Sequence, residues 1–417
     1  MTSDRVYVWT WLEGRDEPVV AGALDPVGPQ LRFVYGRSYL DRPDAVPLYV
    51  PELPMVRGGH LPDAGLDLAG CLADGAPDAW GQRVILRRLH GGDIRAVDTA
   101  TLPPVTYLLE SGSDRIGAND FQRSPETYTP RRTSATLEEL LTAADRLQAG
   151  VPFSPELDLV LNAGTSVGGA RPKAALTMDD GRSLIAKFSA PTDSYPVVQG
   201  EALAMELARR VGLDVAVTQP VTVLDRDVLL VDRFDRIPGT TRRRAMVSAL
   251  TMLGLGEMYA RYASYADLAD IVRGRFTAPR ATLTELFSRL VFNVLCGNRD
   301  DHARNHAAFW NGRELTLTPA YDLDPQPRDT GEATQAMAIT REGDRRSRLA
   351  TCLDAADVFL LSPGEARSLI DRQVELIVDG FDAAAATVGM AEGDRRVFRR
   401  RAFLHPYAFE GYGAVPW

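Results

Sequence analysis

The stretch NRDDHARN, residues 298–305, places two carboxylates, an imidazole and two amides within eight residues. Most clusters of this kind are solvated loops. The spacing from Asp300 to Asn305 nevertheless suits phosphoryl transfer, in which an aspartate accepts the proton of the attacking hydroxyl and an asparagine five positions later holds a metal ion. By itself the spacing is weak evidence, because many unrelated chains contain it by chance.

The sequence after this stretch predicts a β-hairpin that brings a further carboxylate back to it. Residues 307–317 read AAFW-NG-RELTL, and an Asn-Gly pair between two apolar runs is a strong hairpin signal. A returning strand ends near the point where the first strand began, so Asp322 should lie near Asn305. We therefore expect a cluster of Asp300, Asn305 and Asp322 with Asp301 nearby. Carboxylate and amide oxygens are ligands that suit Mg²⁺.

The upstream half of the chain contains residues that could hold a nucleotide. Lys187 lies in the otherwise apolar strand LIAKF, where a buried lysine is costly unless it is paired, and Glu201 on a later helix could pair with it. Gly164, Gly168 and Gly169 form a loop whose backbone could approach phosphates closely. Alternatively, Lys187 could bury its aliphatic chain and extend its ammonium group into water, and Glu201 could be an ordinary exposed helix residue.

The hydrophobic pattern predicts the elements that position these residues. The expected strands are 6–12, 18–24, 30–36, 174–178 and 182–188, with two more inside 221–234. Two helices are expected at 76–92 and 197–211. Two more are expected to begin at capping boxes, the first at Thr136 and Glu139 with its end at Gly150, the second at Thr282 and Glu285 with its end at Gly297. From about residue 350 the chain is expected to be helical, and SPGE at 362–365 is a helix start.

Composition excludes several classes of protein. The net charge of −9 argues against a chain that binds nucleic acid alone, because phosphate neutralisation needs a basic surface. The three cysteines have no metal-ligand spacing and suit a reducing compartment. We see no signal peptide and no apolar run long enough for a membrane helix, so we expect a soluble, cytoplasmic protein with no membrane contact.

Taken together, the motifs TSVGGARPKAAL, IAKF, VDRFDR, GNRDDHARN and LTPAYDL resemble the HipA family of toxin–antitoxin serine/threonine kinases. RSYLDRPDAVPLYVPELP and LADGAPDAWGQR are similar to its amino-terminal subdomain, so the resemblance covers most of the chain. It implies an α+β, protein-kinase-like bilobed fold with a strand-rich N-terminal subdomain and a mostly helical C-terminal part. The implied domains are a HipA-type subdomain at 1–110, an ATP-binding N-lobe at 134–235 and a C-lobe at 236–417.

The resemblance also implies a role for each candidate residue in a reaction that uses ATP and Mg²⁺. Asp300 is the implied catalytic base, and Asn305 and Asp322 are the implied metal ligands. The implied nucleotide-binding residues are Lys187, Ser166, Val167, Gly168, Gly169, Asp232, Phe234, Asn305 and Asp322, with Asp232 to Phe234 as the hinge. Ser166 is the implied autophosphorylation site, and the adjacent Thr165 stays open.

Three residues that follow the base have less defined roles. Asp301 stands where some family members have glycine, and its extra charge could raise the pKa of the base or add a metal ligand. His302 and His306 lack the glutamate of a zinc motif, and His302 is expected to be a structural residue that holds the loop.

The resemblance implies partners as well. Family members pair with a small helix-turn-helix antitoxin of the HipB type, through which any DNA contact would be made, and some phosphorylate an aminoacyl-tRNA synthetase. One alternative is a catalytically silent kinase-fold module that acts as co-repressor with the antitoxin. Another is a metal-dependent hydrolase. The presence of Lys187, Asp300, Asn305 and Asp322 argues against the first, and the strand lysine with its glycine-rich loop argues against the second.

Overall fold

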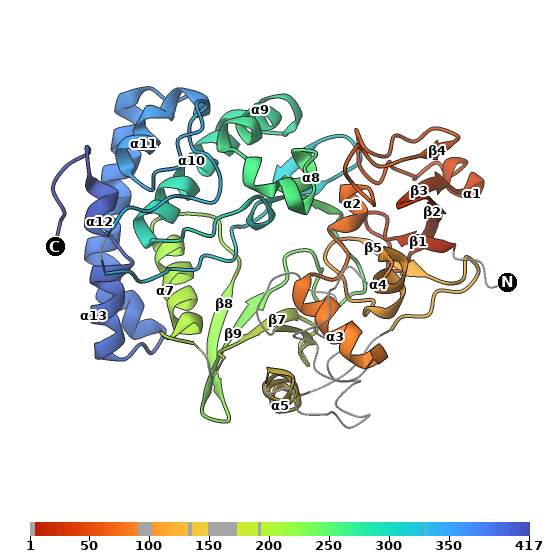
Figure 1. Ribbon diagram of the computed structural model, residues 1–417, viewed down its shortest axis with the longest axis horizontal. Coiled ribbons are helices and arrows are strands. Elements are labelled where there is room, and N and C mark those ends of the chain that lie inside the picture. The colour runs from red at the N-terminus through yellow and green to blue at the C-terminus, as the bar shows by residue number, and fades with distance from the viewer. Residues whose placement is uncertain (1–4, 91–101, 132–135, 149–172, 191–192, 330) are drawn as a thin grey trace. The chain divides into compact units, whose positions relative to one another are not determined.

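The computed structural model of the chain describes residues 5–90, 102–131, 136–148, 173–190, 193–329 and 331–417 (Figure 1). It divides into two compact units that are each assembled from separate stretches of chain. The first unit comprises Met1–Pro191, Val221–Val247 and Phe309–Arg313, and the second comprises Thr192–Pro220, Ser248–Ala308 and Glu314–Trp417. The three-domain division drawn from the sequence stays a prediction.

The first unit contains a five-stranded antiparallel sheet with the order β4-β3-β2-β1-β5. Its strands are β1 (Val6–Thr10), β2 (Val19–Val27), β3 (Gln30–Tyr35), β4 (Gly59–His60) and β5 (Asn119–Gln122). Buried and partly buried residues alternate along β3, whereas most of β1 is buried, and these first three strands were predicted. Val8 of β1 pairs with Phe121 of β5, and both side chains are fully buried. Two short helices accompany this sheet, α1 (Arg37–Leu40) and α2 (Gly70–Ala73).

A four-stranded sheet with the order β6-β7-β9-β8 carries the predicted lysine. Its strands are β6 (Lys173–Thr177), β7 (Ser183–Phe188), β8 (Thr218–Val223) and β9 (Arg226–Asp232). The predicted turn between β8 and β9 is real, and Leu224 and Asp225 both adopt positive φ there. One core joins buried side chains of this sheet to the helices α3 (Ala79–His90), α4 (Pro104–Glu110) and α5 (Leu137–Gln148).

The second unit is mostly helical (Figure 1). Its α-helices are α7 (Val197–Arg210), α8 (Ala249–Met252), α9 (Tyr265–Arg275), α10 (Pro279–Cys296), α11 (Leu349–Asp354), α12 (Pro363–Thr387) and α13 (Glu392–Arg401). Its 3-10 helices are η4 (Glu257–Tyr262), η5 (Ala303–Asn305), η6 (Ala356–Phe359) and η7 (Pro406–Phe409). The last three strands, β10 (Met246–Ser248), β11 (Ala307–Trp310) and β12 (Leu315–Leu317), form a small sheet in the order β10-β11-β12.

The helix boundaries test the capping signals. Thr136 and Glu139 exchange the two hydrogen bonds of a capping box, and so do Ser362 and Glu365, as predicted. The capping box predicted at Thr282 is wrong, because α10 begins at Pro279, one turn earlier. Proline is pre-organised for the first helical position, so it sets the start of the helix.

Glu285, the second member of that predicted box, has a different partner. It accepts a hydrogen bond from Nε of Arg289 at 2.8 Å, one turn further along the same helix. Within the described ranges, no helix combines the length and apolarity needed to cross a membrane.

Candidate active site

The predicted catalytic loop begins where α10 ends. Gly297 terminates the helix with φ of 75°, which is the left-handed conformation that glycine adopts without strain. A Cβ atom at this position would lie 2.8 Å from the carbonyl oxygen of Ala402, so the site also requires the absence of a side chain. The amide of the next residue, Asn298, donates to the carbonyl of Asn293 at 2.9 Å. The loop therefore leaves the helix in a fixed direction.

The backbone of Asp300 is held from both sides. Oδ1 of Asn298 accepts a hydrogen bond from the Asp300 amide at 3.2 Å. The Asp300 carbonyl accepts from Nδ2 of Asn305 at 3.2 Å and from the amide of His302 at 2.8 Å. The residue itself is exposed, so a fixed backbone presents its carboxylate to solvent. This is the arrangement that a base acting on an external hydroxyl needs.

The electrostatic surroundings of Asp300 favour its protonated form. Partial burial raises the pKa of Asp300 above its ordinary value of 3.8, and the nearby carboxylates of Asp322 and Asp301 raise it further, against an opposing effect of His302. A raised pKa makes the carboxylate a better proton acceptor near neutral pH. The effect of Asp301 agrees with one of the two roles left open for it.

The hairpin returns the chain to the loop as the spacing predicts. After β12 the chain reaches Tyr321, whose hydroxyl donates to the carbonyl of Arg304 at 2.7 Å. Asp322 follows with φ of 61°, and its carboxylate acts on the pKa of Asp300. The structure therefore brings Asp300, Asn305 and Asp322 together, although their roles remain predictions.

The donor atoms present here fit a magnesium ion. Nδ2 of Asn305 is committed to the Asp300 carbonyl, which directs the amide oxygen of Asn305 elsewhere as a candidate ligand. Together with the Asp322 carboxylate this gives hard oxygen donors, and a Mg²⁺ ion usually completes its octahedron with water and substrate phosphates. Among the described residues, no group of three or more His, Cys, Asp or Glu side chains forms a metal site. Asn305 and Asp322 would hold the ion together with water and substrate phosphates.

Asp301 is part of a buried polar cluster that the sequence did not reveal. Its carboxylate accepts a hydrogen bond from the hydroxyl of Tyr265 and lies 3.0 Å from Nε2 of His306. The rings of Tyr265 and His306 meet edge to face with centroids 5.4 Å apart. His306 is therefore bonded to this loop as a structural residue, and the structural role expected of His302 stays a prediction. In the described part of the chain the side chain of His302 makes no such bonds, and its Nδ1 is buried without a hydrogen-bond partner.

Lys187 lies near the end of β7 in the first unit. Leu184, Ala186 and Phe188 of this strand are buried in the core, so Lys187 is directed to the opposite face of the sheet. Glu201, its expected partner, is a buried residue of α7. The pairing of the two stays a prediction. Thr165, Ser166, Val167, Gly168 and Gly169 lie outside the described residues.

The predicted hinge follows β9. Asp232 accepts from Nη1 of Arg182 at 3.3 Å, and the ring of Phe234 meets Phe309 edge to face at 5.9 Å. The amide of Arg233 between them donates to the carbonyl of Ser183. The hinge backbone is therefore anchored to the neighbouring strand.

A largely buried network of charges fixes the residues around this hinge, and no sequence pattern predicted it. Asp235 lies 2.8 Å from Nη2 of Arg233 and 2.8 Å from Nη1 of Arg236. Asp114, more than a hundred residues upstream, lies 2.8 Å from Nη1 of Arg233 and 2.9 Å from Nη2 of Arg236. Each carboxylate bridges both arginines, so every charged side chain in this group of four is paired with side chains of opposite charge.

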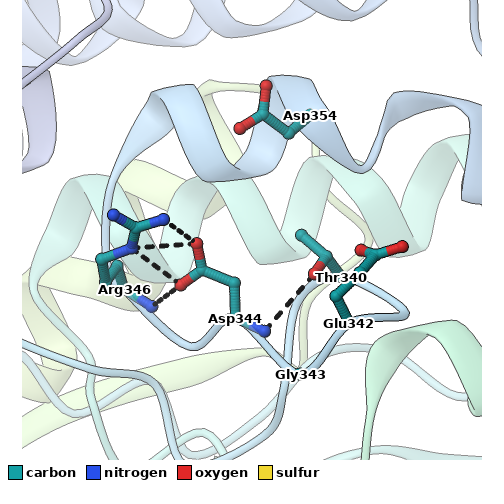
Figure 2. Close-up of a pocket in the computed structure, with 6 residues that line it drawn as sticks. All are labelled: Thr340, Glu342, Gly343, Asp344, Arg346 and Asp354. Carbon is teal, nitrogen blue, oxygen red and sulfur yellow. Dashed lines mark hydrogen bonds and ion pairs between the residues drawn. The ribbon is translucent and has the colours of Figure 1, made fainter.

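The second unit contains an open hollow. It is lined by Thr340, Glu342, Gly343, Asp344, Arg346 and Asp354 (Figure 2). Figure 2 shows the Asp344 carboxylate facing Arg346, while its amide donates to Oγ1 of Thr340 at 3.3 Å. The hollow contains no predicted site residue.

Comparison with known proteins decides the family. The model of the HipA-like C-terminal domain matches residues 165–381, which include Lys187 and the whole loop from Asn298 to Asp322. The chain belongs to this family. The family predicted from the motifs is confirmed.

Relatives of this HipA-like chain extend the match. A protein of Sinorhizobium fredii named "Putative kinase Y4mE" is 25% identical over 413 residues, covering 91% of this chain and 90% of the relative. The protein of Shewanella oneidensis named serine/threonine-protein kinase toxin HipA is 30% identical over 213 residues, covering 46% of this chain and 48% of the relative.

A solved structure shows the same fold over nearly the whole HipA-like chain. It is the Shewanella oneidensis toxin–antitoxin complex of HipA, HipB and operator DNA, matched with a TM-score of 0.71 and 19% identity over 94% of this chain and 93% of that chain. The α+β fold class with a strand-rich amino-terminal part and a helical carboxy-terminal part is confirmed.

Proposed function

We propose that this HipA-like chain is a serine/threonine protein kinase that transfers the γ-phosphoryl group of ATP to a protein hydroxyl. The observation that carries the proposal is the fixed backbone of Asp300, which presents an exposed carboxylate with a raised pKa beside Asn305 and Asp322. The names of the relatives as kinases support it.

The reaction assigns one task to each group. The acceptor oxygen forms a bond to the γ-phosphorus while the bond from that phosphorus to the bridging oxygen breaks, and ADP leaves. The acceptor proton passes to the carboxylate of Asp300. Lys187 would balance phosphate charge, and the amide oxygen of Asn305 with the carboxylate of Asp322 would hold Mg²⁺. When bound, this ion neutralises charge that develops between the phosphates.

Several finer assignments rest on the family alone. We propose that Ser166 of the glycine-rich loop is phosphorylated by the enzyme itself, with Thr165 as the competing position. We further propose a HipB-like antitoxin as partner, in line with the complex in which the related fold was solved. An aminoacyl-tRNA synthetase is the proposed class of protein substrate, and the chain would act in the cytoplasm.

The test is phosphate incorporation measured by mass spectrometry after incubation with ATP and Mg²⁺. The Asp300→Asn variant should lose about 10²–10⁴-fold in rate, the usual contribution of a general base. Asp379→Asn, which alters an exposed aspartate of α12, is the matched control and should keep the wild-type rate. No phosphate on the wild-type chain or on any protein of a cell extract would overturn the kinase proposal. Phosphate elsewhere than Ser166 would overturn only the loop assignment.

A further inference from the structure

The 3-10 helix η4, Glu257–Tyr262, exposes apolar side chains that nothing in the proposed reaction explains. None of its residues is buried, and Met258, Tyr259 and Tyr262 are 83%, 50% and 58% exposed. The two tyrosine rings stack with centroids 6.2 Å apart. Exposed apolar residues are usually scattered singly, and a local group of them marks an interaction site. We call these six residues the aromatic turn.

The aromatic turn is bonded directly to the catalytic loop. Oε2 of Glu257 lies 2.8 Å from Nε and 2.7 Å from Nη2 of Arg304. Arg304 stands between Asp300, the proposed base, and Asn305. The surface that Met258 and the tyrosines expose is therefore connected to the loop that carries Asp300.

A second connection runs through the segment that follows Asp322. The amide of Ala338 donates to the carbonyl of Ala263, directly after the aromatic turn, and the amide of Ala336 donates to the carbonyl of Arg299, directly before the proposed base. The turn, the loop and residues 336–338 thus form one continuous part of the second unit.

The aromatic turn and the side chains bonded to it carry more positive than negative charge. The guanidinium of Arg261 lies 4.9 Å from the Tyr262 ring centroid and donates to its hydroxyl at 3.1 Å, and Arg345 donates to the Arg261 carbonyl. With Arg304 these make three guanidinium groups against the single carboxylate of Glu257, whereas the net charge of the chain is −9. Tyrosine and arginine are enriched where proteins bind proteins.

We propose that the aromatic turn docks the acceptor-bearing segment of a polypeptide substrate. An aromatic or long apolar residue of that segment would pack on Met258, Tyr259 and Tyr262, and an acidic residue would face Arg261. The inference rests on the proposed kinase function, since it places the hydroxyl of the same segment beside Asp300. Charge complementarity favours an acidic segment over a second copy of the surface, because two copies would bring like charges together.

The test uses a positional library of synthetic peptides with a central serine as the acceptor. The wild-type enzyme should prefer peptides that combine an aromatic residue with an acidic one. The variant Met258→Ser/Tyr259→Ser/Tyr262→Ser should raise the KM for the best peptide about tenfold or more, as the loss of buried anchor residues does. Its kcat, its KM for ATP and the phosphorylation of its own chain should not change.

Two further variants separate docking from a general effect on the surface. Leu224→Asn/Leu360→Asn removes exposed apolar side chains elsewhere, at positions with positive φ where asparagine is tolerated, and should leave the peptide KM unchanged. Arg261→Glu should shift the library preference from acidic towards basic residues, a change of specificity that a merely structural role would not produce.

The results of these experiments distinguish failure of the docking proposal from failure of the kinase proposal. A wild-type enzyme that phosphorylates neither itself nor any protein defeats that proposal first. A wild-type enzyme that is active on itself, but shows no peptide preference, or whose triple variant keeps the same peptide KM, overturns the docking surface. Conversion of a wild-type dimer to a monomer by the triple variant, with peptide KM unchanged, would show a second copy as the occupant and also overturn it.

Discussion

Nε2 of His306 lies 3.0 Å from Oδ1 of Asp301, and both side chains are buried beneath the loop that carries Asp300. The Tyr265 hydroxyl donates to the same carboxylate from the first turn of α9. Burial alone would raise the pKa of Asp301, but the charge and hydrogen bond of His306 and the bond from Tyr265 hold it below the ordinary value. Asp301 is therefore an ionised anchor of the loop, and its carboxylate is occupied by protein partners.

Removing this anchor should destabilise the second unit. Asp301→Ala deprives two buried groups of their hydrogen-bond acceptor, and we expect it to lower the free energy of unfolding by about 3 kcal/mol. Urea denaturation followed by circular dichroism measures the loss. Glu342→Ala, at an exposed carboxylate of the same unit, is the control and should change stability by less than about 0.5 kcal/mol. Equal stability of the two variants would contradict the role of Asp301 as an anchor.

The pH dependence of phosphoryl transfer should report the raised pKa of Asp300. The base must be ionised, so kcat/KM should fall as pH decreases through a midpoint above the ordinary aspartate value of 3.8. Asp301→Asn removes a neighbouring negative charge, so the midpoint should move to lower pH. Steady-state kinetics across a pH series measures both, and a midpoint that moves to higher pH in the variant would argue against repulsion between the two carboxylates.

Gly297, at the end of α10, allows a test of whether the nearby backbone of Ala402 excludes a side chain there. Gly297→Ala and Gly389→Ala both place a methyl group at a positive φ after a helix, which typically costs about 1 kcal/mol. A Cβ at Gly389 meets nothing within 4 Å, whereas one at Gly297 lies 2.8 Å from the Ala402 carbonyl oxygen. We expect the Gly297 variant to lose more stability in thermal unfolding and also to lose activity. Similar losses in both would mean that only φ matters.

Acid should weaken the first unit through the charge network at the hinge. Burial opposes ionisation of Asp235, yet Arg233 and Arg236 lower its pKa from 3.8 to about 2. A lowered folded pKa contributes stability that is complete above the unfolded value and is lost as pH falls from about 4 to about 2. The contribution is roughly 2 kcal/mol for a shift of this size. Urea denaturation at several pH values measures the slope, which should flatten in Asp235→Asn.

Local signals in the sequence were sufficient to predict the geometry of the catalytic loop. The Asn311–Gly312 turn and the glycine after α10 predict how the chain enters and leaves, so the approach of Asp322 to Asp300 followed from spacing. The same kind of signal failed at Thr282, because Pro279 one turn earlier begins the helix first. Capping boxes are short patterns, and a proline can override them.

Contacts between distant residues could not be read from the sequence. Tyr265 lies 36 residues before Asp301, and nothing in its own neighbourhood marks it as the partner of a buried carboxylate. Asp235 and Arg233 are buried, although charged residues are normally expected at the surface. Their burial depends on pairing, including that of Arg233 with the distant Asp114, which only the fold creates.

The support of Gly297 comes partly from the far end of the chain. Ala402 packs against it, and the amide of Leu404 donates to the carbonyl of Leu295 at 2.7 Å. Residues 401–404 lie beyond the region matched by the family model, which ends at residue 381. A ribosome adds roughly 5–20 residues per second, so residues 401–404 are synthesised roughly 5–20 s after the loop. The contacts can form only after that time. A nascent chain would therefore carry Asp300 for that time without the backing that fixes it, and the enzyme would become competent only after residues 401–404 have been synthesised.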